Sequence, residues 1–336
     1  MCRIRGPRLL PKVLSLVAAL SLLGCSDQFS IPLEAGAGGV LLASWTDGDE
    51  LLAVGGHLDG TSGLLVRAQE DTWCADDEFA DRPIWWIHGN GQGRWYAVGE
   101  NGLILRHEAG ETTDESVDTP ATLYGVWDSG DRVLAVGGDV WGDRLGEIWL
   151  RDSGGWSLVA SGLPGVLFKV WEDWIVGDSV IYRLGSGDLG FEQKLFGLQD
   201  YSVSEQPRLL TVRGRADDDV WAVGGNAQGT LWHWDGTAWS EVPLSPLCTN
   251  QALNGIWTDP GEDVWIAGMS GAMGAWTGSE WNCPEVPITG EHFHAVWPLG
   301  DEMLWFGGNL FSSGDNYATI ARYGSEQRAI EFVDCP

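Results

Sequence analysis

The chain carries little positive charge and no long apolar segment. Only 19 of its 336 residues are Lys or Arg, against 48 Asp or Glu, which gives a formal net charge of −29. Nucleic-acid binding needs a basic surface that neutralises phosphates, so this class of partner is excluded. The apolar run from Val13 to Leu23 is too short to cross a bilayer as a helix, which needs about 20 residues.

The motifs of several large enzyme classes are also missing. The sequence contains no GxSxG nucleophile elbow, no HExxH zinc motif and no phosphate-binding glycine loop. These absences exclude a serine hydrolase of the elbow type, a zinc peptidase and a P-loop nucleotidase. Any site must therefore be built from residues that the fold brings together.

The first 24 residues differ from the rest of the chain. Four basic residues precede the apolar run: Arg3, Arg5, Arg8 and Lys12. This arrangement is typical of a signal peptide. The sequence Leu-Leu-Gly-Cys that ends at Cys25 resembles the lipobox of bacterial lipoproteins. The resemblance implies cleavage before Cys25, acylation of that cysteine and a lipid anchor in a membrane.

The residue after Cys25 indicates which of the two bacterial membranes would hold the lipid anchor. Ser26 stands where an aspartate would retain a lipoprotein in the inner membrane of enteric-type bacteria, so the sequence favours the outer membrane. We expect a signal peptide at 1–24, a lipidated N terminus and short tether at 25–39, and one domain at 40–336. The expected product is a monomer in the cell envelope.

The rest of the chain repeats with a period near 40 residues. Seven short apolar segments each end on a glycine: Gly55, Gly99, Gly137, Gly177, Gly224, Gly268 and Gly308. Several short strands per repeat, with no helical pattern between them, are the signature of a β-propeller. We expect an all-β chain folded as a seven-bladed β-propeller of four-stranded antiparallel blades, with six or eight blades as the alternatives.

Two repeats depart from a second landmark, the tryptophan that ends the first strand. Five repeats have it: Trp45, Trp127, Trp171, Trp257 and Trp297. Repeats two and five carry His88 and Arg213 instead. We expect these two side chains nearly opposite each other at the channel mouth, where they would suit anion recognition or acid–base chemistry. The alternative is repeat drift without a function.

The repeats also carry a family resemblance. Units such as DVWAVGGNAQGTLWHWDGTAW at 219–239 resemble the tryptophan-rich propeller repeats of bacterial surface lipoproteins, notably those of myxobacteria. They are similar to the sialidase-like repeats of photosystem II assembly factors and, through their glycine doublets, to kelch repeats. The resemblance covers about residues 40–333 and implies a propeller. It does not imply one function, because propellers host scaffolds, lectins, lyases and hydrolases.

Four cysteines remain when Cys2 and Cys25 are set aside, and an even number predicts two disulfides in an exported chain. Cys248 and Cys283 follow the outer strands of neighbouring repeats, and Cys335 and Cys74 do the same if repeat seven meets repeat one. We therefore expect the bonds Cys248–Cys283 and Cys74–Cys335, the second closing the ring. A further candidate for closure is the segment 29–33, as an added strand of the last blade.

Acidic residues gather in the turns between the first and second strands of six repeats. The expected acidic face comprises Asp47, Asp49, Asp131, Asp217, Asp218, Asp219, Asp263 and Asp301. It would dock a basic partner or calcium, unless it reflects only the preference of aspartate for turns. No turn has the alternating carboxylates of a calcium loop. His292 and His294 would share a strand face but lack a third metal ligand. No cofactor is expected.

Together these features predict an envelope-anchored, non-catalytic propeller that binds or scaffolds a protein or a glycan. The alternative is a propeller enzyme of the hydrolase, lyase or lactonase type, acting on a carbohydrate or lactone with His88 and Arg213 at its site. No residue is assigned a catalytic role.

Overall fold

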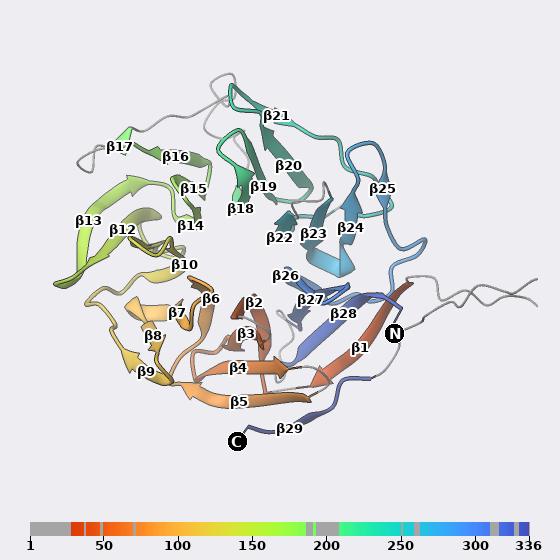
Figure 1. The fold of residues 1–336 in the computed structure, drawn as a ribbon. Helices are drawn as coiled ribbons and strands as arrows, with labels where there is room; N and C mark the ends of the chain where they lie inside the picture. Colours follow the sequence, from red (N-terminus) through yellow and green to blue (C-terminus); the bar gives the residue numbers. More distant parts are fainter. Residues whose placement is uncertain are drawn as a thin grey trace, which may run out of the picture.

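The computed structural model describes residues 28–36, 38–47, 50–69, 72–185, 191–192, 208–249, 251–258, 263–309, 316–325 and 329–335. The predicted signal peptide and Cys25 lie outside these residues. Seven antiparallel blades surround a central axis, which confirms the predicted seven-bladed propeller (Figure 1). The described part of the chain contains no helix of the length and hydropathy that a membrane span requires.

Each blade is a meander whose first strand lies nearest the axis (Figure 1). Blade 1 comprises β2 (Val40–Asp47), β3 (Glu50–His57), β4 (Ser62–Gln69) and β5 (Thr72–Ala80). Blade 2 comprises β6 (Ile84–Gly89), β7 (Arg94–Gly99), β8 (Ile104–Glu108) and β9 (Glu111–Asp114), with the 3₁₀ turn η1 (Glu100–Gly102) after β7. Blade 3 comprises β10 (Thr122–Asp128), β11 (Val133–Gly138), β12 (Leu145–Asp152) and β13 (Gly155–Pro164).

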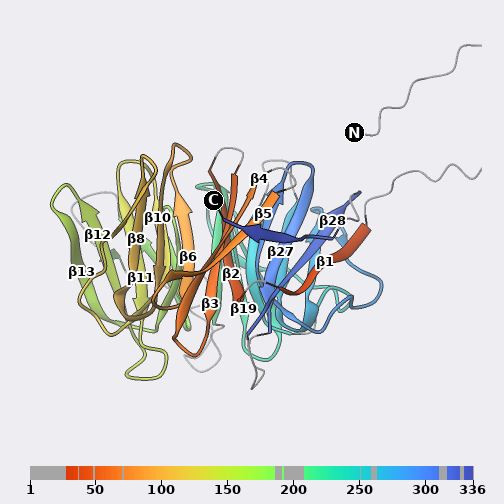
Figure 2. The same cartoon turned by 90° about the horizontal axis from the view of Figure 1, so that it is seen from below.

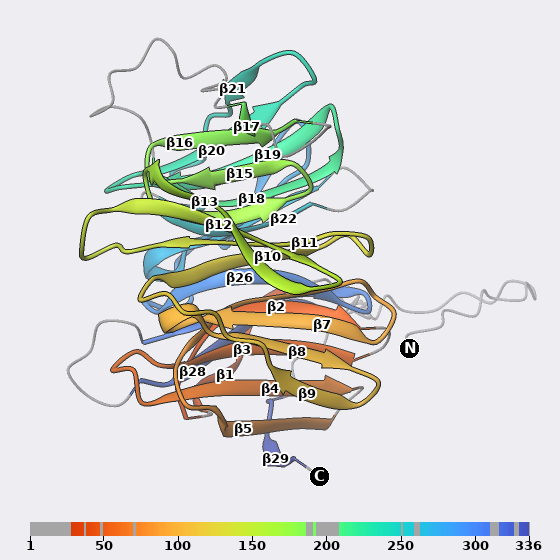
Figure 3. The same ribbon diagram turned by 90° about the vertical axis from the view of Figure 1, so that its left-hand side faces the viewer.

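The next three blades repeat this order, and Figure 3 shows several of them edge-on. Blade 4 comprises β14 (Leu167–Trp171), β15 (Trp174–Gly177), β16 (Val180–Leu184) and β17 (Phe191–Glu192). Blade 5 comprises β18 (Leu209–Ala216), β19 (Asp219–Gly225), β20 (Gly229–Trp234) and β21 (Trp239–Glu241). Blade 6 comprises β22 (Leu253–Thr258), β23 (Val264–Gly268), β24 (Met273–Trp276) and β25 (Trp281–Asn282), with the 3₁₀ turn η2 (Met269–Gly271) after β23.

Blade 7 is built from both ends of the chain. Its inner strands are β26 (His292–Leu299), β27 (Glu302–Gly308) and β28 (Ala318–Gly324), and its outer strand is the N-terminal β1 (Gln28–Gly36), antiparallel to β28. The boundary expected at residue 40 is therefore wrong, since residues 28–36 belong to the propeller and not to a tether. The reason is physical: β1 covers the open edge of β28 and buries Leu33.

The ring is closed a second time at the C terminus. Strand β29 (Phe332–Asp334) pairs in parallel with β5 on the outside of blade 1, as Figures 1 and 2 show. The disulfide Cys74–Cys335 lies beside this pairing and joins residues 261 apart in the sequence. The two predicted closures, the disulfide and the added N-terminal strand, thus coexist.

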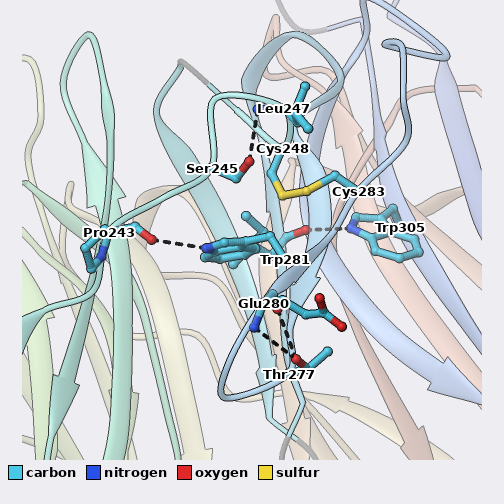
Figure 4. The surroundings of a disulfide bond; sticks show 10 residues. Pro243, Ser245, Leu247, Cys248, Thr277, Glu280, Trp281, Cys283 and Trp305 are labelled. Atoms are coloured by element: carbon cyan, nitrogen blue, oxygen red, sulfur yellow. Dashed lines mark hydrogen bonds between the residues drawn. A yellow bond between two sulfur atoms is a disulfide. The ribbon is translucent and has the colours of Figure 1, made fainter.

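The second disulfide, Cys248–Cys283, is also present (Figure 4). It ties the segment after β21 to the residue that follows β25, so it joins blades 5 and 6. The same segment is held by the indole Nε1 of Trp281, which donates to the carbonyl oxygen of Pro243 at 3.1 Å (Figure 4). Both pairings expected from the repeat positions are therefore formed.

The repeated glycines are places of close backbone approach. On the innermost strand, each of these glycines has a pairing partner. A Cβ on the glycine would lie 1.8–2.5 Å from the carbonyl oxygen of the residue that precedes that partner. No side chain fits at that distance. The set is Gly55, Gly99, Gly137, Gly177, Gly224, Gly268 and Gly307. In the last blade Gly307, which pairs with Phe293, is the equivalent residue and not the predicted Gly308.

Tryptophan side chains fill the seams between blades. Trp174 of blade 4 is buried, and its ring centroid lies 5.1 Å from that of Trp234 and 5.3 Å from that of Trp239, both in blade 5. Trp305 of blade 7 donates from Nε1 to the carbonyl oxygen of Ile266 in blade 6 at 2.7 Å. Because each seam buries large rings from both sides, every blade depends on its neighbours for its core.

Candidate functional site

Every innermost strand carries a β-bulge at the same position. In each blade one residue has no partner on the second strand, just after the residue that pairs with the repeated glycine. A bulge leaves its extra residue unpaired and re-aims the side chain. We call these seven residues the mouth ring: Leu42, Trp85, Tyr124, Phe168, Leu210, Asn254 and His294.

All seven mouth-ring residues line one cavity of about 420 Å³ at the axis. The turns between second and third strands add Leu58, Glu100, Val140 and Trp141 to its wall. Those turns lie at the opposite end of the blades from the acidic turns between first and second strands. The cavity therefore opens on the face opposite the acidic one, and its volume is within the usual range of small-ligand pockets.

One side of the cavity is aromatic. Trp85, Tyr124 and Phe168 come from the consecutive blades 2 to 4 and meet edge to face, with ring centroids 5.1 Å and 5.4 Å apart. Trp141, in the turn between β11 and β12, is 96% exposed and adds a further indole to the cavity wall. An exposed tryptophan beside a hollow is typical of a binding surface.

Polar side chains also line the cavity, and we call Lys169, Arg208, Asn254 and His294 its polar arc. The Asn254 side chain donates from Nδ2 to the carbonyl oxygen of Phe293 at 2.9 Å. Arg208 lies with Cζ 5.5 Å from the Phe168 ring centroid and donates from Nε to Asp178 at 3.3 Å. The Nε2 atom of His294 is buried and has no hydrogen-bond partner among the described residues.

Lys169 is the least expected member of the polar arc. It is 9% exposed, donates from Nζ to the carbonyl oxygen of Tyr124 at 2.6 Å and lies 4.3 Å from the Trp86 ring centroid. Burial lowers the pKa of its ammonium to about 7. Burial also lowers the pKa of His294 to about 3, with the charge of Lys169 as a second cause. His294 is therefore neutral at pH 7.

The predicted site residues His88 and Arg213 do not line the cavity. They belong to a deeper inner ring that ends the first strands, together with Trp45, Trp127, Trp171, Trp257 and Trp297. Trp86 separates the two levels, because it lines both the cavity and a void of about 10 Å³ that touches Arg213.

Both residues are packed against tryptophan. The His88 ring is stacked on Trp127 at 3.9 Å between centroids, and its Nδ1 accepts the backbone N–H of Asp128 at 3.1 Å. Burial lowers the pKa of His88 to about 3, and the nearby charge of Arg213 adds to this effect. The Arg213 Cζ lies 3.9 Å from the Trp257 ring and 4.4 Å from the Trp297 ring. Burial lowers the pKa of Arg213 to about 9, which leaves the guanidinium charged.

The two departures from tryptophan have a steric explanation. Each is followed by a glycine, and a Cβ on Gly89 or Gly214 would lie 2.5 Å from the indole of the preceding blade, Trp45 or Trp171. The preceding tryptophan therefore leans across these two strands and takes space in the inner ring. A smaller or thinner side chain, here His88 or Arg213, fits beside it.

The acidic residues are divided by the structure into exposed and bonded groups. Asp131, Asp217, Asp218 and Asp301 are exposed in turns. Asp263 and Asp301 line a groove of about 330 Å³ between blades 6 and 7. Asp219 is engaged internally, since it accepts hydrogen bonds from Arg215, Trp221 and His233. Asp49 lies outside the described residues, as does the side chain of Asp47.

No metal site emerges among the residues that the structure describes. They contain no group of three or more His, Cys, Asp or Glu side chains placed to hold an ion. His292 accepts the backbone N–H of Ser270 at Nδ1, whereas His294 lies at the bulge and lines the cavity. The two histidine side chains therefore have different surroundings.

The mouth ring escaped sequence interpretation, although a simple signal exists. Each of its members stands three residues before a member of the inner ring, as Tyr124 does before Trp127 and His294 before Trp297. Counting back from the tryptophan landmark would have found all seven. Lys169 would then have been noticed as a charged residue next to one of them.

Comparisons with known proteins give the fold and no family. No protein-family model matches the chain, and no curated protein does. Among solved structures, YCF48 bound to a D1 peptide is similar with a TM-score of 0.62 at 17% identity, covering 89% of this chain and 97% of that one. YCF48 from Cyanidioschyzon merolae gives 0.60 at 14%, covering 89% and 99%. The WD40 propeller domain of Doa1 gives 0.61 at 11%, covering 89% and 98%. At these identities the likeness shows that the chain has the β-propeller fold, which it shares with YCF48.

Proposed function

We propose that this chain is an envelope-anchored, non-catalytic binding protein whose cavity and mouth ring receive part of a protein or glycan partner. The observation that carries the proposal is the mouth ring itself. Seven strands each contribute one unpaired residue to a single hollow that is lined by both aromatic rings and polar side chains. Bulges that re-aim side chains are over-represented next to functional sites.

Two further observations favour binding over catalysis. His88 and Arg213, the residues that the enzyme alternative relied on, are packed against tryptophan rings below the cavity. Among the residues that the structure describes, the cavity lining includes no serine, threonine or cysteine that a neighbouring base could activate. A protein partner is supported by YCF48, a propeller of this fold that has been solved with a D1 peptide bound.

The anchor is tested at the lipobox cysteine. Replacing Cys25 with serine removes the sulfur that would be acylated, so the full-length variant should lose labelling by a fatty-acid probe and leave the membrane fraction. The parent chain should carry the label and sediment with outer membranes. A labelled, membrane-bound C25S protein would contradict the lipoprotein proposal.

The binding face is tested by partner capture from envelope extracts. We expect Trp141→Ser and Trp85→Ala each to reduce recovery of the captured partner about tenfold or more, as truncation of a central aromatic contact does. Trp141 is 96% exposed, so its loss should not affect folding. Quantitative mass spectrometry of the captured material measures the effect.

Two controls make the capture experiment decisive. Leu158→Ser alters another exposed apolar side chain, 47% exposed, on the outer strand β13 and should leave recovery unchanged. The double variant Asp217→Asn with Asp218→Asn neutralises exposed turn residues on the acidic face without touching Asp219. If the acidic variant loses the partner and the tryptophan variants keep it, the cavity is not the binding site.

A further inference from the structure

The polar arc presents hydrogen-bond donors and an unpaired positive charge. Lys169 has a carbonyl oxygen and an indole as partners, and no carboxylate pairs with it among the described residues. An ammonium group has three N–H donors, and only one of them is used by the Tyr124 carbonyl. Buried charges in proteins are normally paired, so this ammonium is suited to an anion that enters the cavity.

His294 adds a second polar group with capacity for a further hydrogen bond. Its buried Nε2 has no partner among the described residues, and the ring lines the cavity with Lys169. The ring is neutral, since burial holds the pKa of His294 at about 3. In the tautomer that carries hydrogen on Nε2, the ring donates to an oxygen of the ligand.

The aromatic side of the cavity specifies the rest of the ligand. Trp85, Tyr124 and Phe168 offer an apolar wall beside the polar arc. Glu100, a carboxylate among the described residues of the cavity lining, lies in the turn after β7 of blade 2, the blade that also carries Trp85. A ligand that fits both sides has an anionic end and an apolar or ring-shaped body. One ammonium without an acidic partner matches a single negative charge better than a phosphate dianion, which is costlier to desolvate.

We propose that the cavity binds an apolar monocarboxylate, with the carboxylate at Lys169 and His294 and the apolar body against Trp85, Tyr124 and Phe168. This inference rests on the proposed function, because it names the ligand of the same site. Two kinds of ligand carry such a group: a free small acid, and the C-terminal carboxylate of a polypeptide that ends in an aromatic residue.

The test uses matched acids and amides on the folded protein. Titration calorimetry would compare 3-phenylpropionate with 3-phenylpropionamide, and the peptide Gly-Gly-Phe with its C-terminal amide. We expect each acid that binds to do so at least tenfold more tightly than its amide at pH 7. Tight binding of phenylpropionate alone assigns a free acid, and tight binding of the peptide alone assigns a chain terminus.

Two variants test whether Lys169 is the group that causes the preference for acid over amide. Lys169→Met should abolish the preference for acid over amide, whereas Arg132→Met, which removes a positive charge on the acidic face, should retain it. In the parent chain the preference should fall by up to about tenfold per pH unit above pH 7, as Lys169 loses its proton. Within the described part of the chain, the other ionisable groups that line the cavity are Glu100, Tyr124, Arg208 and His294. The pH dependence should vanish with Lys169→Met.

The outcomes separate the two proposals. If acids and amides bind equally well, or if Lys169→Met keeps the preference, the carboxylate inference is wrong while the cavity remains a binding site. If no compound binds but the tryptophan variants still lose their captured partner, the inference alone fails. If no compound binds and those variants keep the partner, both proposals fail.

Discussion

Replacing Cys74 and Cys335 together with alanine is expected to lower the free energy of unfolding by about 5 to 6 kcal/mol. The bond closes a loop between residues 261 apart, so it removes much of the conformational freedom of the unfolded chain. In the chain-entropy account of disulfides, longer loops give larger stabilisation. Urea unfolding without reductant, followed by tryptophan fluorescence, measures the loss.

The second disulfide supplies the matched comparison. Cys248 and Cys283 are 35 residues apart, and their replacement by alanine should cost about 3 to 4 kcal/mol, less than the loss at Cys74 and Cys335. Both variants should keep seven blades, because β1 still pairs with β28 and β29 with β5. A larger loss at Cys248–Cys283 would show that loop length does not govern the stabilisation.

Replacing Lys169 with methionine is expected to stabilise the protein, with a gain that depends on pH. The pKa of Lys169 is lowered from 10.5 to about 7 in the folded chain, so between these values the unfolded chain binds more protons. The cost of burying this amine is fully present below pH 7 and disappears as the pH rises towards 10.5. At about 1.4 kcal/mol per pKa unit, the gain amounts to several kcal/mol at pH 6.

Thermal unfolding at pH 6, 8 and 10 measures this gain. The midpoint of Lys169→Met should exceed that of the parent chain most at pH 6 and least at pH 10. Arg132→Met, at an ion pair with Asp173 that is partly exposed, should show no such trend. A pH-independent difference, or a less stable methionine variant, would mean that the buried amine is not the source of the cost. A stabilising variant would also show that the native lysine is retained at the expense of stability.

The blades and disulfides could be predicted because each rests on a landmark that recurs in the sequence. Gly224 belongs to the glycine landmark of the second strands and Trp257 to the tryptophan landmark of the first strands, and each landmark recurs from repeat to repeat. In that register the cysteines fall beside neighbouring outer strands. The N-terminal strand was foreseen only as a candidate for closure. Its pairing with β28 depends on an edge that exists only when the ring is complete.

The cavity could not be predicted in the same way, because a bulge is a property of strand register. Asn254 and Gly255 look like consecutive residues of an alternating strand. The pairing with β23 shows that Gly255 has a partner, Ala267, and that Asn254 has none. His88 and Arg213 attracted attention because they break a pattern. In each case the cause lies in the preceding blade: Trp45 leans over Gly89, and Trp171 leans over Gly214.

The mouth ring has a consequence for how such a protein can change. Its seven residues have no partner on the second strand of their blades, so they take no part in the pairing between the first and second strands. Substitution at these positions alters the hollow and leaves the tryptophan seams in place. A chain of this architecture can therefore acquire a new ligand through a handful of single exchanges, one per blade, while its fold is inherited unchanged.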